Sequence, residues 1–248
     1  MTDNTARFDG KGEIYAKARP KYALGLFEYM KNELHIAPGS VFADIGSGTG
    51  IFTKQLLDIG CKVFAVEPNA DMRARAEESL AGRERFASVN GSDARTGLES
   101  GSIDCVTAAQ AFHWFDKNAF RTECARILKP GGQVMLVYNF RVEAECTKAL
   151  AELRRKYSPD FKGFSNGVSE SDCIGFFGGR CDIFRADNTQ HYDRGGYIGR
   201  ALSSSYSKSE GEPGYGEYLA GLNRIFDEFS REGRMAVPME TVAYIGTV

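Results

Sequence analysis

Two patterns of apolar residues alternate along the chain as far as Asn139. Runs of consecutive apolar residues are typical of buried strands, and apolar residues spaced three or four positions apart are typical of helices. The predicted strands cover residues 41–45, 61–67, 86–90, 103–108 and 133–138. The predicted helices cover residues 22–34, 52–59, 71–80 and 117–128. This order predicts a Rossmann-like, doubly wound α/β fold with helices on both faces of a mostly parallel sheet.

The pattern is weaker after Asn139. Two more helices are predicted there, over residues 144–156 and 215–229, and two more strands, over residues 181–189 and 237–248. The sheet then has seven strands, with the C-terminal strand as an antiparallel edge. Residues 157–177 are rich in glycine and phenylalanine without a clear period, and this suits a mobile, partly apolar lid over a substrate.

A chain of 248 residues fits one α/β domain. We therefore expect a single domain over residues 1–248, composed of four parts. They are an N-terminal arm and helix (1–35), a ligand-binding core (36–139), a substrate cap (140–180), and C-terminal strands with a helix (181–248).

A glycine-rich segment, residues 44–50, directly follows the first predicted strand and precedes a helix. Glycines let the backbone turn and approach a ligand, and the helix aims its free N–H groups at the same place. A tight turn without a ligand has the same pattern. However, Glu67 ends the second predicted strand about 20 residues after Gly48, the spacing at which a carboxylate binds ribose hydroxyls. The two features together favour a nucleotide-like cofactor.

The glycine spacing separates two kinds of cofactor. A dinucleotide fingerprint has glycine at the first, third and sixth positions. Counted from Gly46, the sixth position is Ile51, and the glycines fall instead at Gly46, Gly48 and Gly50 behind Asp44. This pattern favours a cofactor without a pyrophosphate and disfavours a NAD-type oxidoreductase.

Four segments together resemble the class I S-adenosylmethionine-dependent methyltransferases: residues 44–50, 66–69, 91–94 and 128–132. Residues 110–115, Gln-Ala-Phe-His-Trp-Phe, are similar to the branch that methylates small molecules, which includes trans-aconitate and quinone-biosynthesis methyltransferase-like enzymes. The resemblance extends from about Phe8 to Asn139. It implies S-adenosylmethionine as the methyl donor and S-adenosylhomocysteine as the product.

The resemblance also implies roles for individual residues. Asp44 is expected to orient the amino group of the cofactor, directly or through water, and Glu67 to hold the ribose hydroxyls. Asp93 is expected to bind the adenine amino group. The other cofactor-binding residues that it implies are Gly46, Ser47, Gly48, Gly50, Pro68, Met72, Ala94 and Gln110.

The segment from Phe8 to Tyr22 is similar to the opening of the same branch. In that comparison Tyr15, Arg19 and Tyr22 cover the cofactor, and Arg19 pairs with its methionine carboxylate. A surface arm followed by the start of a helix is an equally good interpretation of these residues.

The acceptor side of the site is less defined. His113 is the candidate general base because the pKa of histidine lies near neutrality, although a structural histidine is more common. Phe112 and Trp114 are candidates to contact an apolar substrate or to pack in the core. Four arginines can bind an anionic substrate or lie in solvent: Arg141, Arg154, Arg155 and Arg200. A carboxylate or hydroxyl acceptor is favoured, and the reaction is an in-line displacement.

Composition limits the partners. The net charge is −2 with no long basic run, so we expect a small-molecule substrate rather than nucleic acid, and no apolar run is long enough for a membrane span. None of the six cysteines forms a C-x-x-C pair, which predicts no metal site and a reducing compartment, the cytoplasm. The chain is expected to be a monomer or homodimer. A nucleic-acid or protein methyltransferase, or a non-catalytic module that binds S-adenosylmethionine, are the alternatives.

Overall fold

A computed structural model of the protein describes residues 20–161, 163–164, 168–204 and 206–248. Its centre is a seven-stranded sheet in the order β3-β2-β1-β4-β5-β9-β6. The strands are β1 (Val41–Ile45), β2 (Lys62–Val66), β3 (Phe86–Val89), β4 (Ile103–Ala109), β5 (Leu128–Arg141), β6 (Asp182–Asp187) and β9 (Met239–Gly246). The first five pair in parallel, and β9 pairs antiparallel with both β5 and β6. The predicted fold class is therefore confirmed.

Helices cover both faces of this sheet. Helices α2 (Leu24–Asn32) and α3 (Ile51–Asp58) pack on one face in a core that includes Phe27, Phe52 and Leu56. Helices α5 (Lys117–Ile127) and α7 (Glu170–Phe176) pack on the other face around the rings of Phe112, Phe120 and Phe176. Helix α4 (Ala70–Ser79) lies beside β3. Asn69 is the N-cap of this helix, because its side chain accepts a hydrogen bond from the Met72 N–H at 2.9 Å.

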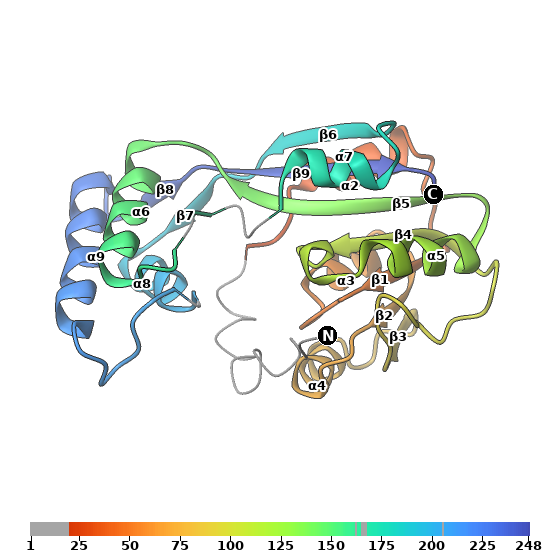
Figure 1. The fold of residues 1–248 in the computed structure, drawn as a ribbon, viewed down its shortest axis with the longest axis horizontal. Coiled ribbons are helices and arrows are strands. Elements are labelled where there is room, and N and C mark those ends of the chain that lie inside the picture. The colour runs from red at the N-terminus through yellow and green to blue at the C-terminus, as the bar shows by residue number, and fades with distance from the viewer. Residues whose placement is uncertain (1–19, 162, 165–167, 205) are drawn as a thin grey trace.

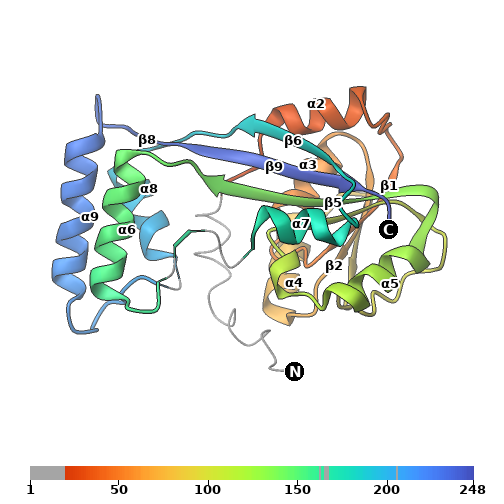
Figure 2. The ribbon, with the colours of Figure 1, turned by 45° about the horizontal axis from the view of Figure 1, so that its top comes forward.

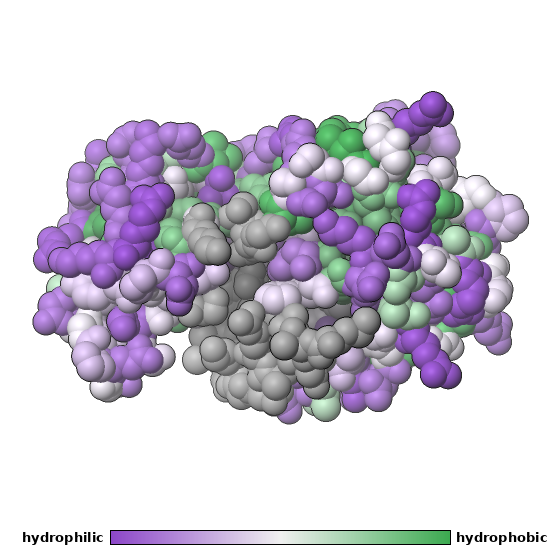
Figure 3. Space-filling view, in the orientation of Figure 1, coloured by the Kyte–Doolittle hydropathy of each residue, from purple (hydrophilic) through white to green (hydrophobic). Residues whose placement is uncertain are grey.

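A second lobe stands beside the sheet, at the left of Figures 1 and 2. We call it the cap lobe. It contains α6 (Glu145–Tyr157), α8 (Arg194–Leu202), α9 (Tyr215–Phe229) and the antiparallel pair β7 (Gln190–Tyr192) and β8 (Met235–Val237). Its separate core includes Leu150, Tyr197, Leu222 and Phe226. Strands β5 and β9 run from the sheet toward this lobe (Figure 1), so this antiparallel strand pair connects the two lobes. Hydrophilic residues predominate on the outer surface of the cap lobe in Figure 3.

Three details differ from the sequence-based expectation. The C-terminal strand β9 is antiparallel, but it lies between β5 and β6, so β6 forms the sheet edge. Helix α7 lies within the expected cap range 140–180, yet it packs on the sheet. The cap lobe instead combines α6 with elements after residue 189, because α6 and α8 both pack their apolar faces against α9. Among the described residues, no helix is both long and apolar enough to cross a membrane.

Candidate active site

A cavity of about 710 Å³ lies at the carboxyl ends of the parallel strands and extends to the cap lobe. Glu67 follows β2, Gly46 follows β1, Gln110 follows β4, and Arg141 ends β5, and all four line the cavity. Since these strands are neighbours in the order β2-β1-β4-β5, the four residues occupy the cavity wall in the same order. Ligands of open α/β sheets bind at this edge, and the volume falls within the usual range of about 300–1,000 Å³ for small-molecule sites.

The glycine-rich turn forms the wall after β1. Gly46 and Gly48 both have positive φ angles, +67° and +56°, which side chains rarely allow. The N–H groups of Gly46 and Ser47 donate to the Val66 carbonyl at 2.8 and 3.2 Å, and these bonds tie the turn to the end of β2. Gly46, Ser47 and Gly48 line the cavity, whereas Gly50 starts α3 and packs against α4.

Glu67 is bonded to this turn. Its Oε2 accepts from the Gly48 N–H and its Oε1 from the Asn69 N–H, both at 2.8 Å. The side chain is buried yet lines the cavity, and each carboxylate oxygen keeps a lone pair for a ligand. Burial raises the pKa of Glu67, while the two backbone N–H groups act in the opposite direction. The carboxylate is therefore positioned before any ligand binds.

Asp44 lies beneath the turn and does not line the cavity. Its two carboxylate oxygens accept from the hydroxyls of Thr53 at 2.6 Å and Thr107 at 2.9 Å. Burial raises the pKa of Asp44 to about 6, and the charge of Glu67 adds to this effect. Because both carboxylate oxygens face buried hydroxyls, Asp44 is placed to act on a ligand in the cavity through its charge. Direct contact between Asp44 and a cofactor amino group stays a prediction.

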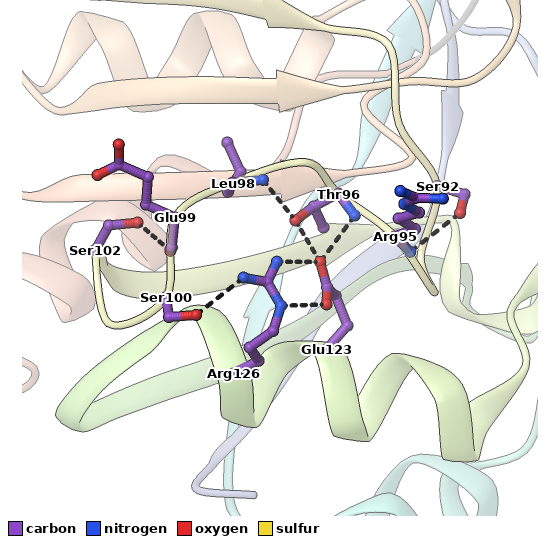
Figure 4. Close-up of polar contacts among 9 residues, drawn as sticks. All are labelled: Ser92, Arg95, Thr96, Leu98, Glu99, Ser100, Ser102, Glu123 and Arg126. Carbon is purple, nitrogen blue, oxygen red and sulfur yellow. Dashed lines mark hydrogen bonds and ion pairs between the residues drawn. The ribbon is translucent and has the colours of Figure 1, made fainter.

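The loop between β3 and β4 carries Asp93, which lines the cavity with Pro68, Met72 and Ala94. Figure 4 shows how α5 holds this loop. Glu123 accepts from both the N–H and the hydroxyl of Thr96, at 2.8 and 2.6 Å, and pairs with Arg126 at 2.7 Å. The Arg126 hydrogen bonds lower the pKa of Glu123 to about 2, so this anchor stays charged. It fixes the loop two residues beyond Ala94.

Gln110 lies at the middle of the cavity wall in a strained conformation. Its φ angle is +58°, and its Nε2 donates to the Asn139 carbonyl at 3.1 Å. The Oε1 atom is buried and has no hydrogen-bond partner among the described residues. Strain in a non-glycine residue persists where the surrounding structure imposes it, and such residues cluster at functional sites. Gln110 thus lines the cavity with one acceptor atom that remains unpaired.

The three aromatic candidates all lie on the short helix η2 (Phe112–Trp114), but their side chains have different surroundings. Trp114 lines the cavity, as expected for a substrate or cofactor contact. Phe112 is fully buried and packs edge-on against Phe176, so its position corresponds to core packing and not to substrate contact. His113 is not among the described residues that line the cavity; its ring packs against Trp114 and Tyr138. The role of His113 as a general base stays a prediction, and no described contact with the cavity supports it.

The remaining expected residues divide similarly. Tyr22 is buried and lines the cavity with Pro20, whereas Tyr15 and Arg19 lie outside the described residues. Arg141, Arg154 and Arg200 line the cap end of the cavity, but Arg155 is exposed and does not. Asn139 also lines the cavity but was not predicted from the sequence. Its position near the end of β5, comparable to that of Gln110 after β4, is the signal that identifies it.

The charges in the cavity wall are separated. The acidic residues that line it are Glu67 after β2, Asp93 after β3, and Asp116 at the start of α5, whose N–H donates to the Asp93 carboxylate at 3.0 Å. The basic residues that line it are Arg141, Arg154 and Arg200. Glu67 and Asp93 lie before Gln110 in strand order, whereas Arg141 follows on β5 and the other two arginines lie on helices of the cap lobe. One end of the cavity therefore suits a cationic or hydroxyl-bearing ligand, and the other suits an anion.

Comparisons with known proteins relate the central part of the chain to methyltransferases. Residues 43–136 match the family described as "Methyltransferase domain". An uncharacterized methyltransferase-like protein of Schizosaccharomyces pombe is 33% identical over 155 residues, which are 59% of this chain and 58% of that protein. The chain thus spans a little over half the length of this relative.

Two solved structures have a similar fold. A proposed type II methyltransferase of Anaeromyxobacter dehalogenans has a TM-score of 0.68 and 22% identity, over 92% of this chain and 97% of that one. The phosphoethanolamine N-methyltransferase 2 of Haemonchus contortus, solved with phosphomonomethylethanolamine and S-adenosylhomocysteine, has a TM-score of 0.54 and 15% identity, over 98% of this chain and 59% of that one. Residues 43–136 thus match a methyltransferase domain, and the two solved structures share the fold of this chain.

Proposed function

We propose that this protein transfers a methyl group from S-adenosylmethionine to a small-molecule acceptor by in-line displacement. The observation that carries the proposal is that one cavity is lined both by the glycine-rich turn with Glu67 and by three arginines of β5 and the cap lobe. A donor and an acceptor that bind at the two ends meet near Gln110, the middle position in strand order.

Several polar atoms of the cavity wall fit this cofactor. The hydroxyls of Ser47 and Thr49 and the Oε1 of Gln110 are buried without a hydrogen-bond partner among the described residues, and all three residues line the cavity. A ligand with amino, carboxylate and hydroxyl groups satisfies such atoms, whereas leaving them unpaired is costly. Glu67 would hold the ribose, Asp93 the adenine amino group, and Pro68, Met72 and Ala94 would lie against the adenine.

S-adenosylmethionine supplies an activated methyl group on a sulfonium. The protein then has to align the acceptor and exclude water. A carboxylate acceptor is ionised at pH 7 and needs no base, whereas a hydroxyl acceptor needs one. Because His113 is not among the cavity-lining residues described, this arrangement favours a carboxylate over a hydroxyl.

A turnover assay tests the proposal. The protein is incubated with methyl-labelled S-adenosylmethionine and a panel of small carboxylic acids and phenols, and labelled products are separated by chromatography. We expect a labelled methyl ester from at least one carboxylic acid. Label found in no product, while S-adenosylhomocysteine still binds, would instead establish the alternative of a non-catalytic cofactor-binding module.

The pKa of Asp44, raised to about 6 by burial, predicts a pH-dependent cofactor affinity. The ammonium group of S-adenosylhomocysteine favours the ionised carboxylate, so its binding favours loss of the proton. Affinity is therefore expected to rise several-fold from about pH 5 to about pH 7, as pH passes through the pKa of Asp44. Calorimetric titration of S-adenosylhomocysteine across this range measures the effect.

The Asp44→Asn variant is the control for this pH profile. Asparagine retains a partner for Thr53 and Thr107 but removes the titrating group. Its profile is expected to be flatter than that of the unmodified protein. Equal slopes in the two proteins would assign the pH dependence to another group, such as Glu67 or Asp93, each of which also has a pKa raised by burial.

We further propose that the protein acts in the cytoplasm, as a monomer or homodimer, and without nucleic acid as substrate. All six cysteines are free thiols, and five of them are buried in the cores. Thiols in this state are what a reducing compartment preserves.

A further inference from the structure

We propose that Arg141, Arg154 and Arg200 form an anion subsite at the cap end of the cavity. It would bind a carboxylate or phosphate group of the acceptor that is distinct from the methylated atom. This inference rests on the proposed function and narrows its substrate class to small acceptors that carry such an additional anionic group.

Arg154 is the strongest observation. It lines the cavity although the residue is only 4% exposed. Its Nη2 donates to the Ala201 carbonyl at 3.3 Å, and its Nε has no hydrogen-bond partner among the described residues. No carboxylate within the described ranges forms an ion pair with it. A buried guanidinium without a counter-charge is unfavourable, so its presence beside a cavity indicates an anion that binds there.

Arg141 reinforces the positive charge. Its guanidinium lies 4.9 Å from the centre of the Phe164 ring, and that of Arg154 lies 5.3 Å from the centre of the same ring. Burial and, to a smaller extent, the charge of Arg154 together lower the pKa of Arg141 to about 10. Two like charges held against one ring repel each other, and an anion between or beside them relieves this repulsion.

The aromatic residues around these arginines restrict how they move. Phe161 lies 5.6 Å from the Arg154 guanidinium and packs against Phe164 and Tyr206. Held beside these rings, the guanidinium groups of Arg141 and Arg154 have less freedom to turn, and a guanidinium can bind carboxylate or phosphate oxygens with two parallel hydrogen bonds. The same rings give an acceptor an apolar surface next to its charged group.

The arginines come from separate elements and not from one basic run. Arg141 ends β5, Arg154 lies on α6, and Arg200 lies on α8. The fold of the cap lobe brings α6 and α8 to one cavity, so the clustering is a product of tertiary structure. Arg155, the neighbour of Arg154, is exposed and does not line the cavity, and it therefore offers a matched control.

Strand order separates this subsite from the cofactor end. Gln110 and Asn139 lie between the acidic residues and the arginines along the cavity. An anionic group held by the arginines leaves the rest of the same molecule to extend toward Gln110. The acceptor is thus anchored by one group and methylated on another.

Calorimetric titration with anions tests the subsite directly. The protein, saturated with S-adenosylhomocysteine, is titrated with propane-1,2,3-tricarboxylate, with inorganic phosphate, and with the neutral propane-1,2,3-tricarboxamide. The variants are Arg154→Met, Arg141→Met, Arg154→Lys and the control Arg155→Met. The affinity for S-adenosylhomocysteine is measured in each, which separates loss of the anion site from loss of folding or of cofactor binding.

We expect one of the two anions to bind and the neutral amide not to bind. Arg154→Met and Arg141→Met should each weaken anion binding about tenfold or more, because each removes charge-assisted hydrogen bonds. The anion affinity of Arg154→Lys should lie between that of Arg154→Met and that of the unmodified protein. The anion affinity of Arg155→Met should stay within about twofold of the unmodified protein. Binding of the tricarboxylate alone points to a carboxylate acceptor group, and binding of phosphate alone to a phosphate group.

The inference is overturned if neither anion binds, if the neutral amide binds equally, or if the variants at Arg154 and Arg141 match the Arg155 control. Should Arg154→Met fail to fold, Arg141→Met decides, since this residue lies at the strand end. If S-adenosylhomocysteine does not bind, the proposed function fails, but the anion titrations of the protein alone still report on the arginines.

Discussion

Replacement of Glu67 with alanine is expected to lower the affinity for S-adenosylhomocysteine by about 100-fold or more. The carboxylate offers acceptors to two ribose hydroxyls, and a hydrogen bond to a charged group contributes about 1.5–3 kcal/mol. The same carboxylate accepts from the N–H groups of Gly48 and Asn69, so its removal also loosens the turn that faces the cofactor. Calorimetric titration of the purified variant measures the loss.

Two further variants separate these causes. Glu67→Gln keeps the size of the side chain and one oxygen acceptor, and its affinity is expected to lie between those of the unmodified protein and the alanine variant. Glu78→Ala changes an exposed residue of α4 and should leave the affinity unchanged. If Glu67→Ala bound S-adenosylhomocysteine as tightly as Glu78→Ala does, the ribose assignment would be wrong.

Alanine at Gly46 and at Gly48 is expected to have two different effects. A Cβ at Gly46 would lie 2.7 Å from the Ala111 Cβ and 3.2 Å from the Phe115 ring, in addition to the strain of its positive φ angle. Strain and overpacking together should lower the free energy of unfolding by about 2–4 kcal/mol. A Cβ at Gly48 meets no atom within 4 Å, so only the strain of about 1–2 kcal/mol applies there.

The two variants therefore differ in what they lose. Gly46→Ala should be the less stable protein in thermal and urea unfolding, whereas Gly48→Ala should fold but bind S-adenosylhomocysteine more weakly, since its methyl group enters the cavity. Equal stability of the two variants would contradict the close packing of η2 against the turn. Full cofactor affinity in Gly48→Ala would contradict the placement of the cofactor against this turn.

The parallel core of the fold could be predicted closely from the sequence. The predicted strand at residues 41–45 has the bounds of β1, and the predicted helix at 117–128 differs from α5 by one residue. Buried parallel strands are short runs of apolar residues between turns, so the local pattern carries most of the information. The position of Glu67 at a strand end followed from the same pattern.

Elements that depend on tertiary contacts could not be predicted. Helix α8 contains Gly195, Gly196 and Gly199, which disfavour a helix locally, but its Tyr197 and Ala201 side chains are buried in the core of the cap lobe. Likewise, chain order does not determine strand order, and β9 inserts between β5 and β6. The boundaries of the cap were displaced for the same reason.

The candidate site shows the same division. Residues at strand ends, such as Glu67 and Gln110, were found because the topology of a parallel sheet assigns them to one edge. Phe112 and Trp114 are two positions apart, yet one is buried in the core and the other lines the cavity, a difference that only the short helix η2 decides. The convergence of Arg154 and Arg200 likewise depends on the packing of α6 and α8.

The most direct test of the central claim is a calorimetric titration of the unmodified protein with S-adenosylhomocysteine, beside an identical titration with NADH. Saturable binding of S-adenosylhomocysteine in the micromolar range, with no heat from NADH, is the expected result. It would establish the cofactor and leave the acceptor to be identified. Absence of S-adenosylhomocysteine binding by a folded protein would contradict the account, and the glycine-rich turn would then be only a structural connection between β1 and α3.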